Sequence, residues 1–483
     1  MDVANPYTVF SFAAYLAVVL AIGIWAARFS SAGVSEFFVG GRVMNRFVVA
    51  LSAVVSGRSA WLILGLTGMA YMMGAAALWA AVGYIIVELL LFLFYAPRLR
   101  RFSERHDCIT VPDFFAARFG DHDGRLRILL VVILLVFMTG YVAAQFVAGG
   151  KAFAVTFGMP ESTGILATAV IVLLYTILGG FLAVSVSDAV QGVFMMAALV
   201  GLPVLAVLAF GGPEVMGTVL VEIDPTLLDP LAIGMGALVG FVGIGLGSPG
   251  NPHILVRYMS IRDPADLRYA AVVGTLWNVL MAGGAVFIGL AGRAFVPEVA
   301  VLPGADPENI FPVLAETLLH PVLLGVMIAA VLAAIMSTAD SQLLVAASSA
   351  VRDFYETVWR RGERVSQRVL VRISRWVVLA LVLVSLGLAF LAEDLVFWLV
   401  LFAWAGLGAA LGPTSILALF WRRTNRAGVM AGIASGALVT VLWRLVAPFG
   451  GEVYELLPGF AAGLLATVVV SLATRAEDGP EVV

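Results

Sequence analysis

Serine, glycine and arginine side chains occupy the middle of a long apolar segment at 46–74. They are Ser56, Gly57, Arg58 and Ser59. An unbroken helix in hydrocarbon gains nothing from these residues. A helix broken at this point exposes backbone carbonyls that can ligate a cation and amide groups that can hold a carboxylate. The segment therefore predicts an ion or solute site at a helix break. A small-residue face that packs against another helix is the alternative.

A second apolar segment, 232–260, is interrupted by four glycines and two prolines between positions 243 and 253. Proline removes a helix hydrogen bond and glycine is a poor helix former, so an unbroken helix is not expected here. Two interrupted segments in corresponding places are typical of transporters built from two structural repeats with the binding site between them. The letters themselves show no repeat, and a kinked helix with a purely structural role is the alternative.

An oxygen-rich stripe is predicted on a third segment, 321–351. Ala334, Ser337, Thr338 and Ser341 follow the i, i+3, i+4, i+7 spacing of one helical face. Hydroxyl and carbonyl oxygens suit a hard cation such as sodium, and the neighbouring Asp340 would be costly to bury without a function. Hydroxyls that only bond back to the preceding turn are the alternative.

Ionisable residues in three apolar segments predict a buried charge network. Arg58 cannot lose its proton, so it must be paired, and Glu88, Asp188 and Asp340 are the acids within reach. Glu88 or Asp340 is the favoured partner. Asp188 lies near the expected start of a helix, so capping of the first turn is its alternative role. Glu88 has no such role and is expected to face the protein interior.

The composition places the chain in a membrane. Of its 483 residues 62% are hydrophobic and 12% are charged, against about half and about a quarter in soluble domains. A net charge of −3 gives no footprint for nucleic acid, and Cys108 is the single cysteine, so neither an internal disulfide nor a cysteine metal cluster is possible. Catalytic residue patterns are lacking, and we expect no enzyme.

About thirteen apolar segments are each long enough to cross a bilayer, which predicts an all-α integral membrane protein. They lie near 7–27, 46–74, 75–96, 124–149, 161–182, 187–210, 232–260, 269–293, 321–351, 371–392, 395–420, 427–447 and 457–474.

Basic and acidic loops alternate between these segments. Because arginine-rich loops stay in the cytoplasm, the N-terminus is expected outside and the C-terminus inside a bacterial inner membrane. The acidic loops hold residues such as Asp306 and Glu308. The arginines assigned to cytoplasmic loops are Arg28, Arg42, Arg46, Arg98, Arg100, Arg101, Arg105, Arg257, Arg262, Arg268, those from Arg360 to Arg375, and Arg422, Arg423 and Arg426.

Stretches along the whole chain resemble one family, the sodium:solute symporters. They lie at 37–42, 50–68, 179–191, 245–257, 333–349 and 404–423. The resemblance implies a LeuT-type core of two inverted five-helix repeats, 46–210 and 232–420. An extra N-terminal helix and loop (1–45), two C-terminal helices (427–474) and a cytoplasmic tail (475–483) would complete the chain. It also implies sodium-driven uptake of a small organic solute, an amino acid such as proline.

The resemblance also implies roles for individual residues. One sodium ion would bind between the first break and the stripe, and a second near Asp188, Asp340 and Ser341. The first site would use the carbonyls of Val55, Arg58 and Ala334 with the hydroxyls of Ser337 and Thr338. Tyr141 matches an aromatic residue of the substrate cavity. The substrate would be bound by Ser56, Gly57, Ser59, Trp61, Tyr141, Ile244, Ser248 and Asn251.

Four positions depart from the proline-transporting members of the family. Gly57 and Arg58 replace an Asp–Met pair, Ile244 replaces a tryptophan, and Ser248 replaces a tyrosine. These positions line the expected ion and substrate region, so the transporter class is better supported than the substrate. A sodium-independent or proton-coupled carrier of the same fold is the first alternative. A transporter-like sensor is the second, although such domains are found fused to histidine kinases and no kinase domain follows here.

Overall fold

Long apolar helices make up most of the structure, a computed structural model that describes residues 5–30, 42, 44–361, 363, 365–446 and 453–474. Within these ranges the β contacts amount to one isolated bridge, between Met44 and Ile261. Among the described residues, ten helical stretches are long and apolar enough to cross a membrane. They run over Pro6–Trp25, Trp61–Arg105, Arg125–Phe157, Gly180–Ala209, Pro264–Phe295, Pro321–Trp359, Gln367–Ala389, Val396–Phe420, Arg426–Val446 and Leu456–Ala473.

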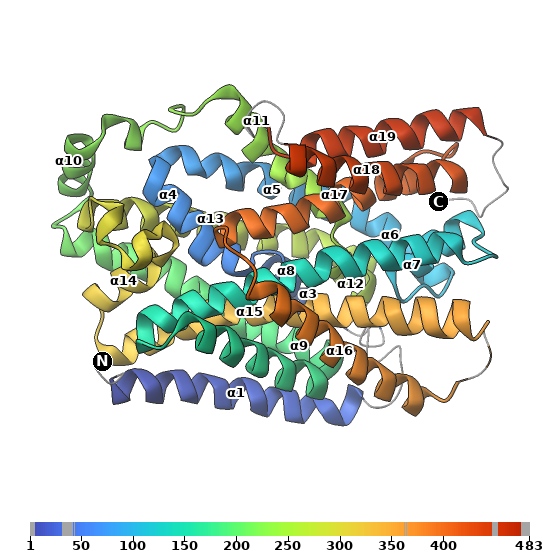
Figure 1. Ribbon diagram of the computed structural model, residues 1–483, viewed down its shortest axis with the longest axis horizontal. Coiled ribbons are helices and arrows are strands. Elements are labelled where there is room, and N and C mark those ends of the chain that lie inside the picture. The colour runs from blue at the N-terminus through green and yellow to red at the C-terminus, as the bar shows by residue number, and fades with distance from the viewer. Residues whose placement is uncertain are drawn as a thin grey trace.

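The helices lie roughly side by side along one direction (Figure 1). α1 (Pro6–Ser30) runs along one edge beside α9 (Glu161–Ala209). α18 (Arg426–Val446) and α19 (Leu456–Ala473) form a pair that packs on α17 (Val396–Phe420). The short helices α10 (Pro213–Ile223) and α14 (Ile310–Leu318) lie at one end of the molecule. α6 (Ala96–Arg105) and α7 (Val111–Phe119) lie at the opposite end.

The interior contains α8 (Arg125–Phe157) and α15 (Pro321–Ser348), which pack on each other and on α9. All residues of α15 from Met327 to Ser348 are buried. α15 continues into a π-helical segment, Ser349–Trp359. α16 (Gln367–Ala389) covers α8 from outside, and α13 (Leu267–Phe295) packs against α3 (Arg46–Ser56), α4 (Thr67–Met73) and α9.

The long element α9 is two antiparallel helices joined at Gly180. The backbone of Gly180 has φ 58° and ψ −171°, a conformation that glycine adopts without strain. On the two sides of Gly180, the Tyr175 hydroxyl donates a hydrogen bond to the hydroxyl of Ser187, which is twelve residues later in the chain. Twelve residues span about 18 Å along a continuous helix, which is farther than a tyrosine side chain reaches. The chain therefore turns back here, as the predicted segments 161–182 and 187–210 require.

Several charged residues assigned to loops by the sequence are buried instead. Arg100 is 2% exposed, and its Nε donates to the Ile261 carbonyl at 2.7 Å. Glu308 is 1% exposed and forms a 2.6 Å ion pair with Lys151, which also contacts Asp306 at 2.6 Å. Burial raises the pKa of Glu308 from its ordinary value. Arg100 lies in the helix α6 and not in a loop, whereas Glu308 lies in the segment between α13 and α14, which folds onto α8. Residues 31–41, Arg364 and the tail 475–483 lie outside the described residues.

Candidate functional site

The first break lies where the sequence predicted it. α3 begins at Arg46 and ends at Ser56. The side chain of the preceding residue, Asn45, caps the first turn by accepting a hydrogen bond from the Val48 N–H. Ser59 has φ 51°, a left-handed conformation that few non-glycine residues adopt, and the chain then resumes as a π-helical segment, Trp61–Leu66. The Ala60 N–H freed by the break donates to Gln145 Oε1 on α8 at 3.1 Å. Gln145 is a contact that sequence reasoning missed.

The oxygen stripe of α15 meets this break. The Thr338 hydroxyl donates to the Ser56 carbonyl at 2.9 Å, and both residues are fully buried. The Ser337 hydroxyl donates to the Ala334 carbonyl at 3.1 Å, and the Ser341 hydroxyl donates to the Ser337 carbonyl at 2.7 Å. Back-bonding to the preceding turn is therefore present for two of the three hydroxyls. Of these oxygens, the Thr338 hydroxyl lies beside the end of α3, where the Val54 and Val55 carbonyls accept from the Gly57 and Arg58 N–H groups.

The second break is also where the sequence predicted it. α11 (Met235–Gly243) passes into a 3-10 segment, Ile244–Gly250, and Asn251 is extended before α12 (Pro252–Ser260) begins. Side chains of α17 bind two freed carbonyls. The Trp404 indole N–H donates to Ile244 at 2.8 Å and the Ser415 hydroxyl donates to Pro249 at 3.0 Å. The carbonyl of the predicted substrate residue Ile244 is thus already bound.

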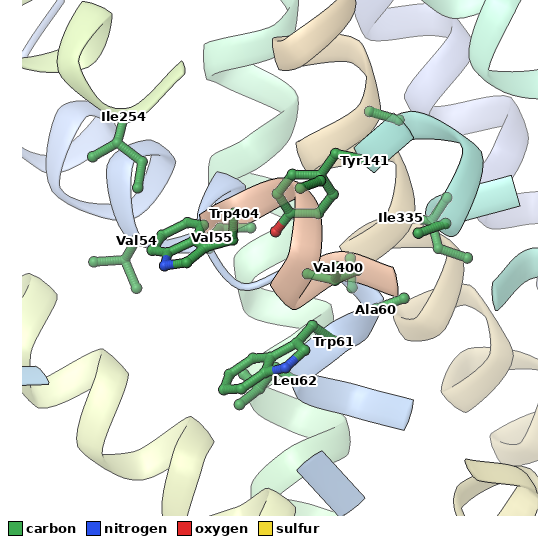
Figure 2. Packing of buried hydrophobic residues seen from close by; sticks show 14 of the residues in the cluster. Val54, Val55, Ala60, Trp61, Leu62, Tyr141, Ile254, Ile335, Val400 and Trp404 are labelled. Atoms are coloured by element: carbon green, nitrogen blue, oxygen red, sulfur yellow. The ribbon is translucent and has the colours of Figure 1, made fainter. Parts of the chain in front are cut away.

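Polar and aromatic groups converge between the two breaks. The Tyr141 hydroxyl is 3.4 Å from Ser59 Oγ, and its ring meets the ring of His253 edge-on with centroids 6.2 Å apart. Figure 2 shows the Tyr141 hydroxyl pointing toward the region bordered by Trp404 and Trp61. Trp61 stacks on Phe397 with centroids 5.5 Å apart.

Several buried polar atoms in this region have no hydrogen-bond partner in the described structure. They are both ring nitrogens of His253, Trp61 Nε1, Gln145 Nε2 and Asn251 Oδ1. Buried polar atoms are normally paired, so a cluster of unpaired ones calls for an explanation such as a ligand. These atoms give the region hydrogen-bonding capacity on both broken helices and on α8.

Arg58 is bound in a closed network on the other side of the first break. Its guanidinium forms an ion pair with Glu88 and donates from Nε to Asn278 Oδ1 at 2.9 Å. Asn278 Nδ2 donates to the second carboxylate oxygen of Glu88 at 2.8 Å. The guanidinium also lies over the Tyr84 ring, 3.8 Å from its centroid. Of the acids that the sequence offered to Arg58, the structure pairs it with Glu88.

This network connects four elements, because it includes the first break, α5 (Trp79–Leu90), α13 and the 3-10 segment of the second break. Ser248 on the last of these lies 3.5 Å from Glu88 Oε1. The predicted substrate residue Ser248 thus contacts the Arg58 network, whereas Tyr141 contacts Ser59.

Asp188 is the centre of a second buried cluster. It pairs with Arg257 at 3.1 Å and accepts from the Ser52 hydroxyl at 2.6 Å. Arg257 also donates to Ser341. Asp188 lies two turns beyond the Gly180 reversal, so the capping role is wrong. Assigning Arg257 to a cytoplasmic loop was also wrong, because α12 continues through it and leaves it 1% exposed.

Asp340 is fully buried, and its carboxylate contacts the Ser341 hydroxyl at 3.2 Å, while its other oxygen has no partner in the described structure. Sequence reasoning missed Gln145, His253, Asn278 and the buried role of Arg257. The available signal was the same for all four: a polar side chain within an apolar segment is costly and therefore a candidate for function.

The model of the sodium:solute symporter family matches residues 37–436. Sodium/proline symporters of Staphylococcus aureus, for example from strains JH9 and NCTC 8325, are 38% identical to this chain over 488 residues. The alignments cover 98% of this chain and 94% of each relative.

Solved structures share the fold. A Na+-coupled sialic acid symporter in a substrate-bound, outward-open state matches with a TM-score of 0.81 at 18% identity, covering 99% of this chain and all of that one. A nucleobase-cation-symport-1 family transporter in a closed conformation matches with a TM-score of 0.56 at 15% identity, over 90% of this chain and 95% of that one.

Proposed function

Because this chain belongs to the sodium:solute symporter family, we propose that it uses the sodium gradient to import an amino acid, with proline as the first candidate. The chain is a multi-pass membrane transporter, and Na+ is its coupling ion. The sodium/proline symporters at 38% identity support proline. The changes at Gly57, Arg58, Ile244 and Ser248 lie in the region expected to contact ligands, so related imino and amino acids belong in the substrate panel.

The contact between α15 and the first break carries this proposal. Thr338 reaches the Ser56 carbonyl, which brings a hydroxyl-rich helix face against the carbonyl end of α3. Oxygen ligands of this kind suit a hard cation. We propose that Na+ binds between Ala334, Ser337 and Thr338 on α15 and the carbonyls of Val55 and Arg58. The Thr338 hydroxyl would then turn its lone pairs to the ion instead of donating to Ser56.

A second sodium site is proposed at Asp188, Ser341 and Asp340. These carboxylates and the hydroxyl lie in one buried cluster, where the adjacent positive charge is the Arg257 guanidinium. Two carboxylates with a single arginine leave the cluster able to accept a further cation. Sodium at this site would compete with Arg257 for Asp188 and Ser341.

The substrate is proposed to bind between the two breaks. Tyr141, Ser59 and Trp61 line one side, and Asn251 and His253 offer unpaired polar atoms on the other. Backbone N–H groups at a helix break suit the carboxylate of an amino acid, and the indole of Trp61 offers an apolar surface for its side chain. Ser56, Gly57, Ile244 and Ser248 complete the proposed set through backbone or neighbouring contacts.

The proposed topology has thirteen crossings with the N-terminus outside and the C-terminus in the cytoplasm of the inner membrane. Arg46–Ser56 joins the start of Trp61–Arg105 in one crossing. The remainder of that stretch forms another crossing beyond Gly74, whose φ is 64°. The apolar helices Glu161–Ile177 and Met235–Gly250 add two more. Residues 46–420 would form the LeuT-type core of two inverted repeats, 46–210 and 232–420.

Uptake by proteoliposomes tests this function. Radiolabelled proline and a panel of amino and imino acids are offered with an inward sodium gradient, with potassium in its place, and with an imposed proton gradient. We expect proline accumulation to need sodium. Thr338→Val should raise the sodium concentration for half-maximal uptake at least about tenfold, since a ligand worth about 1.4 kcal/mol is lost. Thr176→Val is the matched control, because its buried hydroxyl bonds only to Val172 in its own helix. Accumulation without sodium would contradict sodium coupling.

A further inference from the structure

A basic groove opens on the outer surface of the helix bundle, at the end of the molecule where arginines gather. It has a volume of about 490 Å³ and lies between the first half of α6, with the π-helical turn Leu91–Tyr95 before it, and the start of α13. Arg98, Arg101 and Arg268 line it together with apolar residues that include Phe94 and Pro97. The transport mechanism proposed above uses none of these residues.

The positive charge of this groove lacks an acidic counterpart in its lining. The acids next to it are already engaged: Asp266 pairs with Arg46 at 3.5 Å and Glu104 pairs with Arg100 at 2.9 Å. Asp263 accepts the Ala265 N–H at 2.8 Å and keeps its negative charge, but the three arginines of the groove outnumber it. In the described structure Arg101 and Arg268 form no ion pair and are exposed. The groove therefore carries uncompensated positive charge that an anion would neutralise.

The groove lies at the depth of lipid head groups. The helix that starts at Trp79 ends at Arg105, and about 20 of its residues suffice to cross the hydrocarbon layer. Counted from Trp79, that length ends near Arg98. Tyr269 at the start of α13, with Arg46 lying 4.5 Å from its ring centroid, is the kind of aromatic residue found at this interface. The arginines are thus placed where a phosphate group of the bilayer would be.

Two rows of exposed apolar side chains extend from these arginines toward the middle of the membrane. Each row follows four-residue steps along one helix face. From Arg98 the row contains Phe94, Leu90 and Ile86, and from Arg268 it contains Val272, Leu276 and Leu280, all exposed in the structure. A molecule with its anionic group in the groove would thus have lipid-facing surfaces for two hydrocarbon chains beside it.

We propose that this groove binds an anionic phospholipid, with its phosphodiester between Arg101 and Arg268 and its acyl chains along the two apolar rows. Arginine suits phosphate because its planar guanidinium donates two parallel hydrogen bonds. Basic pockets between transmembrane helices on the cytoplasmic side are suited to such head groups. A zwitterionic phospholipid fits less well, since its ammonium group adds positive charge beside the arginines. The bound lipid would connect α6 to α13.

The experiment compares the full chain in detergent micelles containing phosphatidylglycerol, phosphatidylcholine or inorganic phosphate at equal concentration. Thermal unfolding gives the stabilisation, and native mass spectrometry counts the lipids retained. The test variant is Arg101→Gln with Arg268→Gln. The matched control is Arg368→Gln with Arg372→Gln, which removes two exposed arginines of α16 and the same net charge. Proline uptake by each variant shows that it is folded.

We expect phosphatidylglycerol to raise the unfolding temperature of the wild type and of the control by several degrees more than phosphatidylcholine does. The test variant should lose this difference and retain at least one phosphatidylglycerol molecule fewer. Equal effects on test and control variants would overturn the proposal, because the attraction would then be diffuse. A matching shift with inorganic phosphate would also overturn it, because the acyl chains would then contribute nothing.

Discussion

The buried pair of Arg58 and Glu88 gives a quantitative prediction. Both side chains are at most 3% exposed, and Asn278 forms hydrogen bonds with both charged groups. Arg58→Met leaves the Glu88 carboxylate buried without a cation. Breaking a buried pair in this way costs about 3–5 kcal/mol. Glu88→Gln, which strands the guanidinium instead, should cost a similar amount.

The double variant, Arg58→Met with Glu88→Gln, should be more stable than the two single losses predict. It carries no unpaired charge, and the amide oxygen of the introduced glutamine can still accept from Asn278 Nδ2, although Asn278 Oδ1 loses its Arg58 donor and is left as a neutral acceptor. Replacing both members of a buried pair by neutral groups is often close to neutral in free energy. Because the double variant should lose no more stability than either single variant, we expect an interaction free energy of at least about 3 kcal/mol in the double-mutant cycle.

Reversible unfolding in mixed detergent micelles measures these free energies. The control cycle uses the exposed pair of Arg444 and Asp394, which lie 3.0 Å apart and should contribute less than about 1 kcal/mol. A cycle at Arg58 and Glu88 that gives no larger interaction than the control would refute the reasoning.

Uptake by the same variants separates the roles open to Arg58. Its guanidinium contacts α5 and α13 and not the hydroxyls of α15. We therefore expect the double variant to keep wild-type sodium dependence. A stronger sodium dependence in Arg58→Met would show instead that the arginine stands in for a sodium ion. Weaker binding of carboxylate substrates by Arg58→Lys, with sodium-induced stabilisation intact, would show that it holds the substrate.

Two further predictions concern sodium and topology. Sodium at a hundred times its dissociation constant should raise the free energy of unfolding of the wild type by about 2.7 kcal/mol. Asp188→Asn should reduce this stabilisation, whereas the control Asp224→Asn, at an exposed position, should not. An unchanged stabilisation in Asp188→Asn would place the ion elsewhere. Cysteines introduced at the exposed Val301 and Arg361 should react with an impermeant maleimide from outside and inside, respectively. Native Cys108 should stay unlabelled, because it is 1% exposed and burial raises the pKa of its thiol to about 12. Labelling of both introduced cysteines from one side would contradict the topology.

Several features of the site could be predicted from the amino-acid sequence because their causes are local. Helix-breaking residues around Gly57 and between positions 243 and 253 disturb the backbone wherever the helix packs, so both breaks were placed correctly. The stripe from Ala334 to Ser341 follows from helical spacing, which is also local. The requirement that Arg58 be paired follows from the cost of a permanent charge in hydrocarbon.

Other features depended on packing between distant parts of the chain. Glu88 is 30 residues from Arg58 in sequence and Asn278 is 220 residues away, so no local pattern could select this pair over Asp340. Arg257 resembled a loop arginine because it ends an apolar segment, yet α12 places it against Asp188 on α9, 69 residues distant. Glu308 became a buried acid because its loop folds onto Lys151 of α8.

The sequence by itself determined the membrane class, the two helix breaks and the family, because hydropathy, backbone preference and residue identity belong to each segment separately. Only the tertiary structure decided which charges neutralise each other and which polar atoms between the breaks are left unpaired. Those outcomes depend on how helices far apart in the chain are rotated and packed, since an ion pair requires its two groups to approach within about 4 Å.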